Sequence, residues 1–306
     1  MSSGIKSLTA GFLFGVLWGS ASTATKKALF FAQPYTISIC RFFIAAIILL
    51  FIAHVVLRQP LPYKRQWKQL AIYGLLNIAV YLGFFIIGMQ YVSAGIASLF
   101  IATNPVFIAI LSGIWLRKPV GPATIISLVI CSAGILVAAY PLMETSYVTP
   151  LGLLIILISM ISYSVASIYF TLHTWKGMHI LSINGWQTLF GALFTLPFFA
   201  YFYIPEENHF SITLLSSVLW LALPVSIGAV LLWMFLLKEN PVKASFWLFL
   251  CPIFGILIAA LLLREPLSLY TLAGVALVLG GLYIVQRNRQ TKIKKAVPAI
   301  ASEQEA

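Results

Sequence analysis

Ten long apolar runs, separated by short polar breaks, dominate the pattern of the chain. A membrane-spanning helix needs about 20 consecutive, mostly apolar residues, and every run is close to that length. None alternates with the period of two that a barrel strand shows, so the pattern predicts helices. The runs lie at residues 8–27, 34–57, 67–90, 95–116, 122–140, 151–172, 180–204, 213–237, 243–263 and 268–286.

The breaks between the runs combine charged residues with helix breakers or turn formers. Of the 306 residues, 61% are apolar and only 8% are charged, whereas a soluble domain is roughly 45–50% apolar and about 25% charged. This composition excludes a soluble enzyme, a nucleic-acid-binding protein and a secreted disulfide scaffold. The sequence therefore predicts an all-α polytopic membrane protein with ten transmembrane helices.

The lysine and arginine residues predict the orientation of the chain. If the N-terminus is cytoplasmic and there are ten spans, 15 of the 19 basic residues fall on the cytoplasmic side. Such an excess is typical of cytoplasmic loops. We expect both termini in the cytoplasm, with residues 287–306 as a basic cytoplasmic tail. Spread between the runs in this way, the net charge of +12 does not indicate a nucleic-acid partner.

The two halves of the chain resemble each other. Residues 97–134, shifted by 147 positions, align without a gap to residues 244–281 and share nine of 38 residues. The shared residues include a proline inside a run, Pro105 and Pro252. Five spans per repeat is an odd number, so the second copy enters the membrane from the opposite side. We expect two inverted five-helix repeats, at 8–140 and 151–286, as in many secondary transporters.

Several short motifs occur in a characteristic order: Trp18-Gly19-Ser20 with Lys26 beyond it, Arg41-Phe42, Asn104-Pro105, and Leu263-Arg264-Glu265-Pro266-Leu267. In this order the chain resembles the EamA-type drug/metabolite transporter superfamily over residues 8–286. The resemblance implies an exporter or facilitator of small metabolites, often amino acids or amines, in a bacterial or archaeal cytoplasmic membrane. It also implies that spans one, three, four, six, eight and nine line a central cavity, while spans five and ten pack peripherally.

Polar and aromatic side chains inside the runs are the candidate substrate-binding residues. An amide or hydroxyl in hydrocarbon needs a hydrogen-bond partner, and aromatic rings can line a cavity for aromatic or cationic solutes. For each ring taken singly, packing or contact with lipid is an equal alternative. The candidates are Trp18, Ser20, Asn77, Tyr81, Ser98, Asn104, Tyr163, Ser167, Trp233 and Trp247.

Three charged residues are candidates for gating. Arg41 lies about 10 Å deep in the second run, at 1.5 Å per residue. Its side chain either reaches the outer headgroups or forms an ion pair, with an outer acid such as Glu265 or with a substrate carboxylate. Lys26 carries the same ambiguity. Gln187 occupies roughly the position of Arg41 in the second repeat.

Proline and glycine residues predict hinges and close contacts. Paired proline-interrupted spans in corresponding positions point to a midplane site, so we expect Pro105 and Pro252 to act as hinges. Gly11, Gly15 and Gly19 are spaced by four residues and give the first run a smooth face for helix contact.

The chain offers no acid–base or metal-ligand constellation. It contains no aspartate, and no glutamate lies in the middle of a run. Its three cysteines lack ligand spacing. We therefore expect no catalytic residue, metal or cofactor.

The sequence predicts a monomeric secondary transporter in the lipid bilayer. We expect it to move a small molecule by alternating access, through export or facilitated exchange rather than proton antiport. The alternatives are a flippase for lipids or lipid-linked sugars and an integral membrane enzyme.

Overall fold

Helices make up nearly the whole of the computed structural model, which describes residues 3–115, 121–144, 147–175, 177–239, 247, 250–284 and 287. No strand occurs within these ranges, so the all-α class is confirmed for the described part of the chain. The tail at 288–306 and the Arg-Lys-Pro turn at 117–119 lie outside it. The helices are α1 (Ser3–Leu29), α2 (Pro34–Leu50), α3 (Lys64–Gly74), α4 (Tyr81–Gly88), α5 (Ala94–Ala102), α6 (Asn104–Trp115), α7 (Pro122–Glu144), α8 (Pro150–Leu172), α9 (Ile180–Phe202), α10 (Ile212–Trp220), α11 (Val230–Glu239) and α13 (Leu250–Leu263), with a last helix at Leu269–Ile284.

Within the described ranges, six helical runs are long and apolar enough to cross a membrane. Two further apolar helices, α13 and Leu269–Ile284, are shorter. The long helices α1 and α9, with 27 and 23 residues, are not among these runs. The six runs are Pro34–Val56, Lys64–Gly88, Ala94–Trp115, Pro122–Met143, Pro150–Leu172 and Ile212–Trp233.

Three helical runs change from α- to π-helix along their length. The π-helical segments are η1 (Phe51–Val56), η2 (Leu75–Val80) and η4 (Leu221–Ala229), while the short 3₁₀-helix η3 (Pro205–Glu207) lies in a loop. Pro224 lies inside η4 and has no N–H to donate to the preceding turn. π-Helical segments are rare and frequently mark functional sites.

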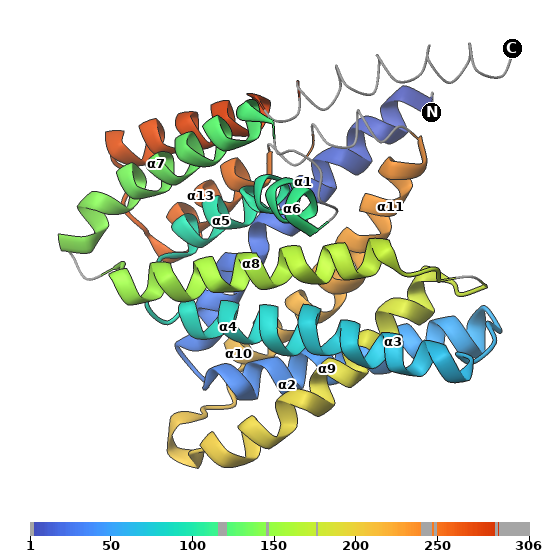
Figure 1. Cartoon of the computed structure of the whole chain (residues 1–306). Coiled ribbons are helices and arrows are strands. Elements are labelled where there is room, and N and C mark those ends of the chain that lie inside the picture. Colours follow the sequence, from blue (N-terminus) through green and yellow to red (C-terminus); the bar gives the residue numbers. More distant parts are fainter. Residues whose placement is uncertain are drawn as a thin grey trace, which may run out of the picture.

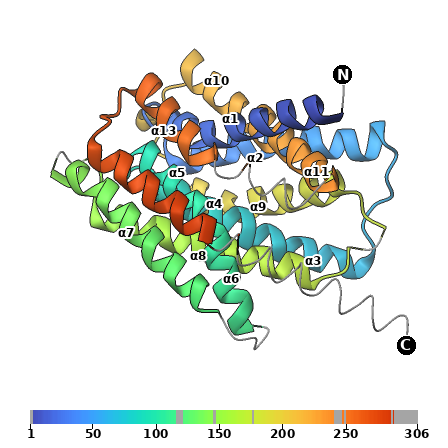
Figure 2. The ribbon, with the colours of Figure 1, turned by 90° about the horizontal axis from the view of Figure 1, so that it is seen from above.

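In Figure 1, α1 crosses the bundle and lies beside α13 and α11. α1 packs against α5, α10, η4, α11 and α13, and α2 packs along α9. On one side of the bundle α7 lies beside the helix Leu269–Ile284, as both views show (Figure 2). The largest buried apolar cluster includes Met89, Leu99, Ile156 and Met160, which are almost completely buried.

Large apolar side chains also cover the outside of the bundle. Leu261, Leu269 and Ile212 are 78%, 82% and 86% exposed. A soluble monomer rarely exposes contiguous apolar surface on this scale. These side chains therefore face lipid, in agreement with a multi-pass membrane protein.

Glycine residues bring α1 and α13 into close contact. A Cβ atom at Gly19 would lie 2.7 Å from the Cys251 carbonyl oxygen and 2.9 Å from the Gly255 nitrogen, and one at Gly15 would meet Leu250. Gly11 lies against the Trp247 ring. Small residues at helix contacts are the usual means of close packing in membranes. The predicted smooth face of the first span is confirmed.

We predict that Gly19→Ala lowers the thermal unfolding midpoint of the purified protein in detergent. The added methyl group meets backbone atoms that cannot move aside, and overpacking of this kind costs about 1–3 kcal/mol. The matched control is Gly280→Ala, because no atom lies within 4 Å of a Cβ built there. The control keeps or slightly raises the midpoint, since alanine favours a helix over glycine by about 1 kcal/mol. Equal midpoints for the two variants would contradict the close contact.

Candidate functional site

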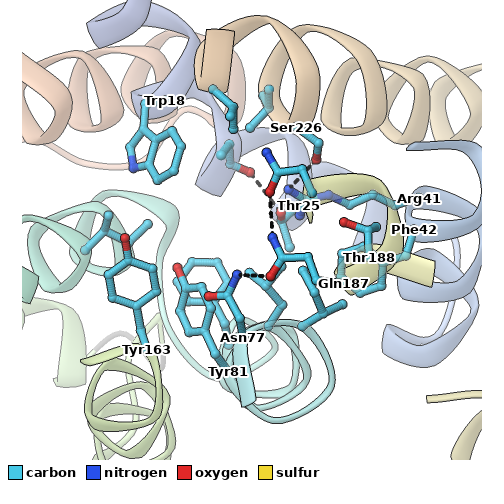
Figure 3. Close-up of a pocket in the computed structure, with 18 residues that line it drawn as sticks. Trp18, Thr25, Arg41, Phe42, Asn77, Tyr81, Tyr163, Gln187, Thr188 and Ser226 are labelled. Carbon is cyan, nitrogen blue, oxygen red and sulfur yellow. Dashed lines mark hydrogen bonds between the residues drawn. The ribbon is translucent and has the colours of Figure 1, made fainter. Parts of the chain in front are cut away.

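A cavity lies inside the bundle and is lined by 18 residues (Figure 3). Its volume is about 130 Å³. A single water needs roughly 10–15 Å³, so the cavity has room for a small organic molecule. Its wall comes from both halves of the chain: from α1, α2, η2, α4 and α5 in the first half, and from α8, α9, η4 and α11 in the second.

Three side-chain amides form a chain of hydrogen bonds on one wall of the cavity. Asn77 Nδ2 donates to Gln187 Oε1 at 3.1 Å, and Gln187 Nε2 donates to Asn184 Oδ1 at 2.6 Å. Asn77 comes from η2, while Gln187 and Asn184 lie one turn apart on α9. The chain supplies the partners that amides need in a low-dielectric interior, and it joins the two halves of the protein at the cavity.

Arg41 on α2 points into the cavity from the same side (Figure 3). Its Nη2 donates to Ser226 Oγ at 3.3 Å, and its guanidinium carbon lies 5.5 Å from the centre of the Phe42 ring. Its Nε is buried and has no hydrogen-bond partner. No acidic residue is among the 18 described residues that line the cavity.

Aromatic rings form the other end of the cavity. Trp18 and Tyr163 lie across from Arg41, and the centres of the Tyr81 and Tyr163 rings are 4.8 Å apart (Figure 3). The structure thus places five of the candidate binding and gating residues on the cavity wall, each from a different helical segment. They are Trp18, Arg41, Asn77, Tyr81 and Tyr163.

The three predicted serines do not line the cavity among the described residues. Ser98 Oγ donates to Ala94 O at 2.9 Å, and Ser167 Oγ donates to Tyr163 O at 2.8 Å. Ser20 Oγ donates to Leu17 O at 2.7 Å and accepts from the Trp220 indole at 2.8 Å. Serine in a helix often bonds to the carbonyl one turn back, and these hydroxyls are used in that way.

Asn104, Trp233 and Trp247 also lie away from the described cavity wall. Asn104 is buried at the first position of α6, where its Oδ1 has no hydrogen-bond partner. The Trp233 ring stacks on Phe14 with ring centres 5.0 Å apart. The position of these residues within a run did not indicate the face of the helix on which they lie.

Thr25, Thr188 and Ser226 line the cavity although the sequence analysis did not select them. A helical stripe could have identified the first two. Thr25 lies seven residues after Trp18 on α1, and Thr188 lies four residues after Asn184 on α9.

The spans that line the cavity differ from those that the family resemblance implies. Spans two and seven, here α2 and α9, contribute to the wall because they carry the polar residues, while α13 contributes no described lining residue.

Lys26 and Glu265 both form hydrogen bonds with the turn between α4 and α5, which lies outside the cavity. Lys26 Nζ donates to the carbonyl oxygens of Met89 at 2.7 Å and Val92 at 3.0 Å. The Glu265 carboxylate accepts from the backbone N–H of Ala94 at 2.6 Å and of Gly95 at 2.9 Å, where the dipole of α5 favours a negative charge.

The ion pair between Arg41 and Glu265, one of the alternatives for Arg41, does not form between these two described residues. Glu265 binds the first N–H groups of α5, whereas the Arg41 guanidinium lies inside the cavity. Of the predicted hinges, Pro105 follows a helix break at Thr103, between α5 and α6. Pro252 lies in the first turn of α13.

An apolar exterior around an internal polar and aromatic cavity defines a multi-pass membrane protein built to hold a small solute. The EamA-like transporter family matches residues 5–140 and 150–287, so the chain belongs to this family. The resemblance drawn from the sequence motifs is thereby confirmed, and the two matched stretches fit a duplicated chain.

Relatives and a solved structure agree with this assignment. An uncharacterized transporter of Archaeoglobus fulgidus is 32% identical, over 89% of this chain and 95% of its own length. Protein PecM of Dickeya dadantii is 28% identical, over 91% and 93%. A crystal structure of a protein with 19% identity shares the fold, with a TM-score of 0.62 over 92% of this chain and 96% of the other. The protein is a membrane transporter and not an enzyme.

We predict that Glu265→Ala lowers the thermal unfolding midpoint in detergent. The change leaves the buried N–H groups of Ala94 and Gly95 without their acceptor, and each unsatisfied buried donor costs about 1–3 kcal/mol. Glu206→Ala is the control, because Glu206 is an exposed glutamate in a loop. If both variants unfold at the midpoint of the unmodified protein, Glu265 does not stabilise the start of α5.

Proposed function

We propose that the protein is a monomeric secondary transporter that moves a small metabolite across the cytoplasmic membrane by alternating access, through export or facilitated exchange. Ten spans form two inverted five-helix repeats, at residues 8–140 and 151–286, with both termini in the cytoplasm. The observation that carries this proposal is the position of the cavity, because both halves of the chain contribute to its wall. Midplane sites at the interface of two repeats are typical of secondary transporters.

The π-helical segments support the inverted repeat. A shift of 147 residues moves η2 (Leu75–Val80) onto residues 222–227, which lie within η4 (Leu221–Ala229). Each segment contributes neighbouring residues to the cavity wall, Asn77 and Ile78 from η2 and Val225 and Ser226 from η4. The same local distortion thus recurs at equivalent positions and serves the same cavity.

The contact between α7 and the helix Leu269–Ile284 has the same symmetry. Ser127 Oγ donates to Gly281 O at 2.6 Å, and a Cβ at Gly134 would lie 2.8 Å from Gly274 O. A shift of 147 residues takes position 127 to position 274 and position 134 to position 281. When the two repeats are exchanged, the contact between residues 127 and 281 therefore corresponds to the contact between residues 274 and 134. Contacts exchanged in this way are expected when a two-fold axis relates two copies.

Lys26 and Glu265 would act as the gate on the outer side. With both termini in the cytoplasm, the turn between α4 and α5 faces outward, and the two side chains tie α1 and the end of α13 to it. Release of these contacts would let the outer ends of the two repeats separate. Alternating access then requires only that the closed and open states differ by a few kcal/mol.

The cavity chemistry favours facilitated diffusion or exchange over proton antiport. Proton-coupled transporters use intramembrane ionisable groups as relays, and the described cavity wall carries neither a carboxylate nor a histidine. The driving force for net movement would then be the gradient of the solute or of a counter-solute.

Uptake into proteoliposomes tests this function. We expect saturable counterflow for at least one member of a panel of radiolabelled amino acids, amines and organic acids. Gln187→Leu should lower that flux about tenfold or more, because it breaks the amide chain and leaves buried partners unsatisfied. Ser216→Ala, which changes an exposed hydroxyl on α10, is the control. Phospholipid scrambling without flux of any solute would indicate a flippase and would overturn the proposal.

A further inference from the structure

The cavity holds a positive charge that the protein does not neutralise. Arg41 Nε is buried without a hydrogen-bond partner, and no described residue of the cavity wall is acidic. An isolated charge in a low-dielectric interior is costly unless it is paired and hydrogen-bonded. Intramembrane charges of this kind mark sites of substrate or ion binding. The missing negative charge is therefore expected on the ligand.

Neighbouring residues hold the guanidinium in place without using up its donors. Ser226 Oγ donates its own proton to Leu221 O at 2.8 Å, so it acts as an acceptor toward Arg41 Nη2. This contact uses one of the five N–H donors of the guanidinium. A planar guanidinium with free donors matches the two oxygens of a carboxylate.

The cavity has a polar end and an aromatic end. Arg41, Gln187 and Thr188 lie together on one side, and Trp18 and Tyr163 lie on the other (Figure 3). The rings are suited to an apolar or aromatic body, and the volume of about 130 Å³ limits that body to a small one.

We infer that the substrate is a small organic carboxylate with an aromatic or apolar body, whose carboxylate binds Arg41 while the body lies between Trp18 and Tyr163. This inference rests on the proposed transport function and narrows its substrate class. A site of this kind disfavours amines. An ammonium group would lie in the same cavity as the Arg41 guanidinium, and the described wall contains no acidic residue that could pair with it. For the same reason an amino acid gains nothing from its ammonium group.

A series of probes that share one aromatic body tests the inference. Calorimetric titration of the purified protein in detergent would compare 3-phenylpropionate, 3-phenylpropanol, 3-phenylpropylamine and phenylalanine. We expect 3-phenylpropionate to bind about tenfold or more tighter than the alcohol and the amine, as a charge-assisted hydrogen bond contributes that much. Phenylalanine should bind no tighter than 3-phenylpropionate. Equal affinity for the acid and the alcohol overturns the inference, as does tighter binding of the amine or of phenylalanine.

Three variants connect the preference to Arg41. Arg41→Gln should abolish the preference for the acid, and Arg41→Lys should keep part of it because the charge remains. Arg65→Gln, which removes an exposed arginine, should leave the preference unchanged. A folded Arg41→Gln protein, judged by its elution and unfolding midpoint, that still prefers the acid overturns the inference. If Arg41→Gln does not fold, the folded Arg41→Lys protein decides: a reduced preference for the acid supports the inference, because lysine keeps the charge but not the planar guanidinium, and an unchanged preference overturns it.

Binding and flux separate this inference from the proposed function. Binding of 3-phenylpropionate through Arg41 without any solute flux would refute transport and leave the carboxylate site standing. Saturable flux of other solutes, with no binding of acetate, benzoate or 3-phenylpropionate at millimolar concentration, would refute the carboxylate site and leave transport standing.

Discussion

The cost of burying polar groups in hydrocarbon is the constraint on which this structure depends. Every amide, hydroxyl and charge within the bilayer needs a partner inside the protein. The chain meets part of this need by bringing three amides and one arginine together at one cavity. The amides of Asn77, Gln187 and Asn184 bond to one another, and Arg41 bonds to Ser226. These paired groups form one wall of the cavity.

The two halves of the chain meet at this cavity. Asn77 belongs to the first half and Gln187 to the second, so the hydrogen bond between them crosses the interface. The π-helical segments η2 and η4 lie on the two sides of that interface and shape its wall.

The sequence predicted the helices well because hydrophobic length is a strong signal in a membrane protein. It predicted which helical runs carry polar and aromatic side chains, but not the direction in which each side chain points. Trp18, Tyr81 and Tyr163 line the cavity, whereas Ser98, which lies inside a run in the same way, bonds within its own helix. The contacts of Glu265 with α5 could not be predicted from one chain, because they join residues 170 and 171 positions apart in the sequence.

Cysteine accessibility at Thr188 measures whether the cavity opens in turn to both sides of the membrane, as the proposed alternating access requires. Cys40, Cys131 and Cys251 would first be replaced, and a single cysteine would be placed at Thr188 on the cavity wall. A membrane-impermeant maleimide would then be added from either side of sealed vesicles of known orientation. We expect labelling from both sides. Labelling from one side alone, or from neither, would refute alternating access.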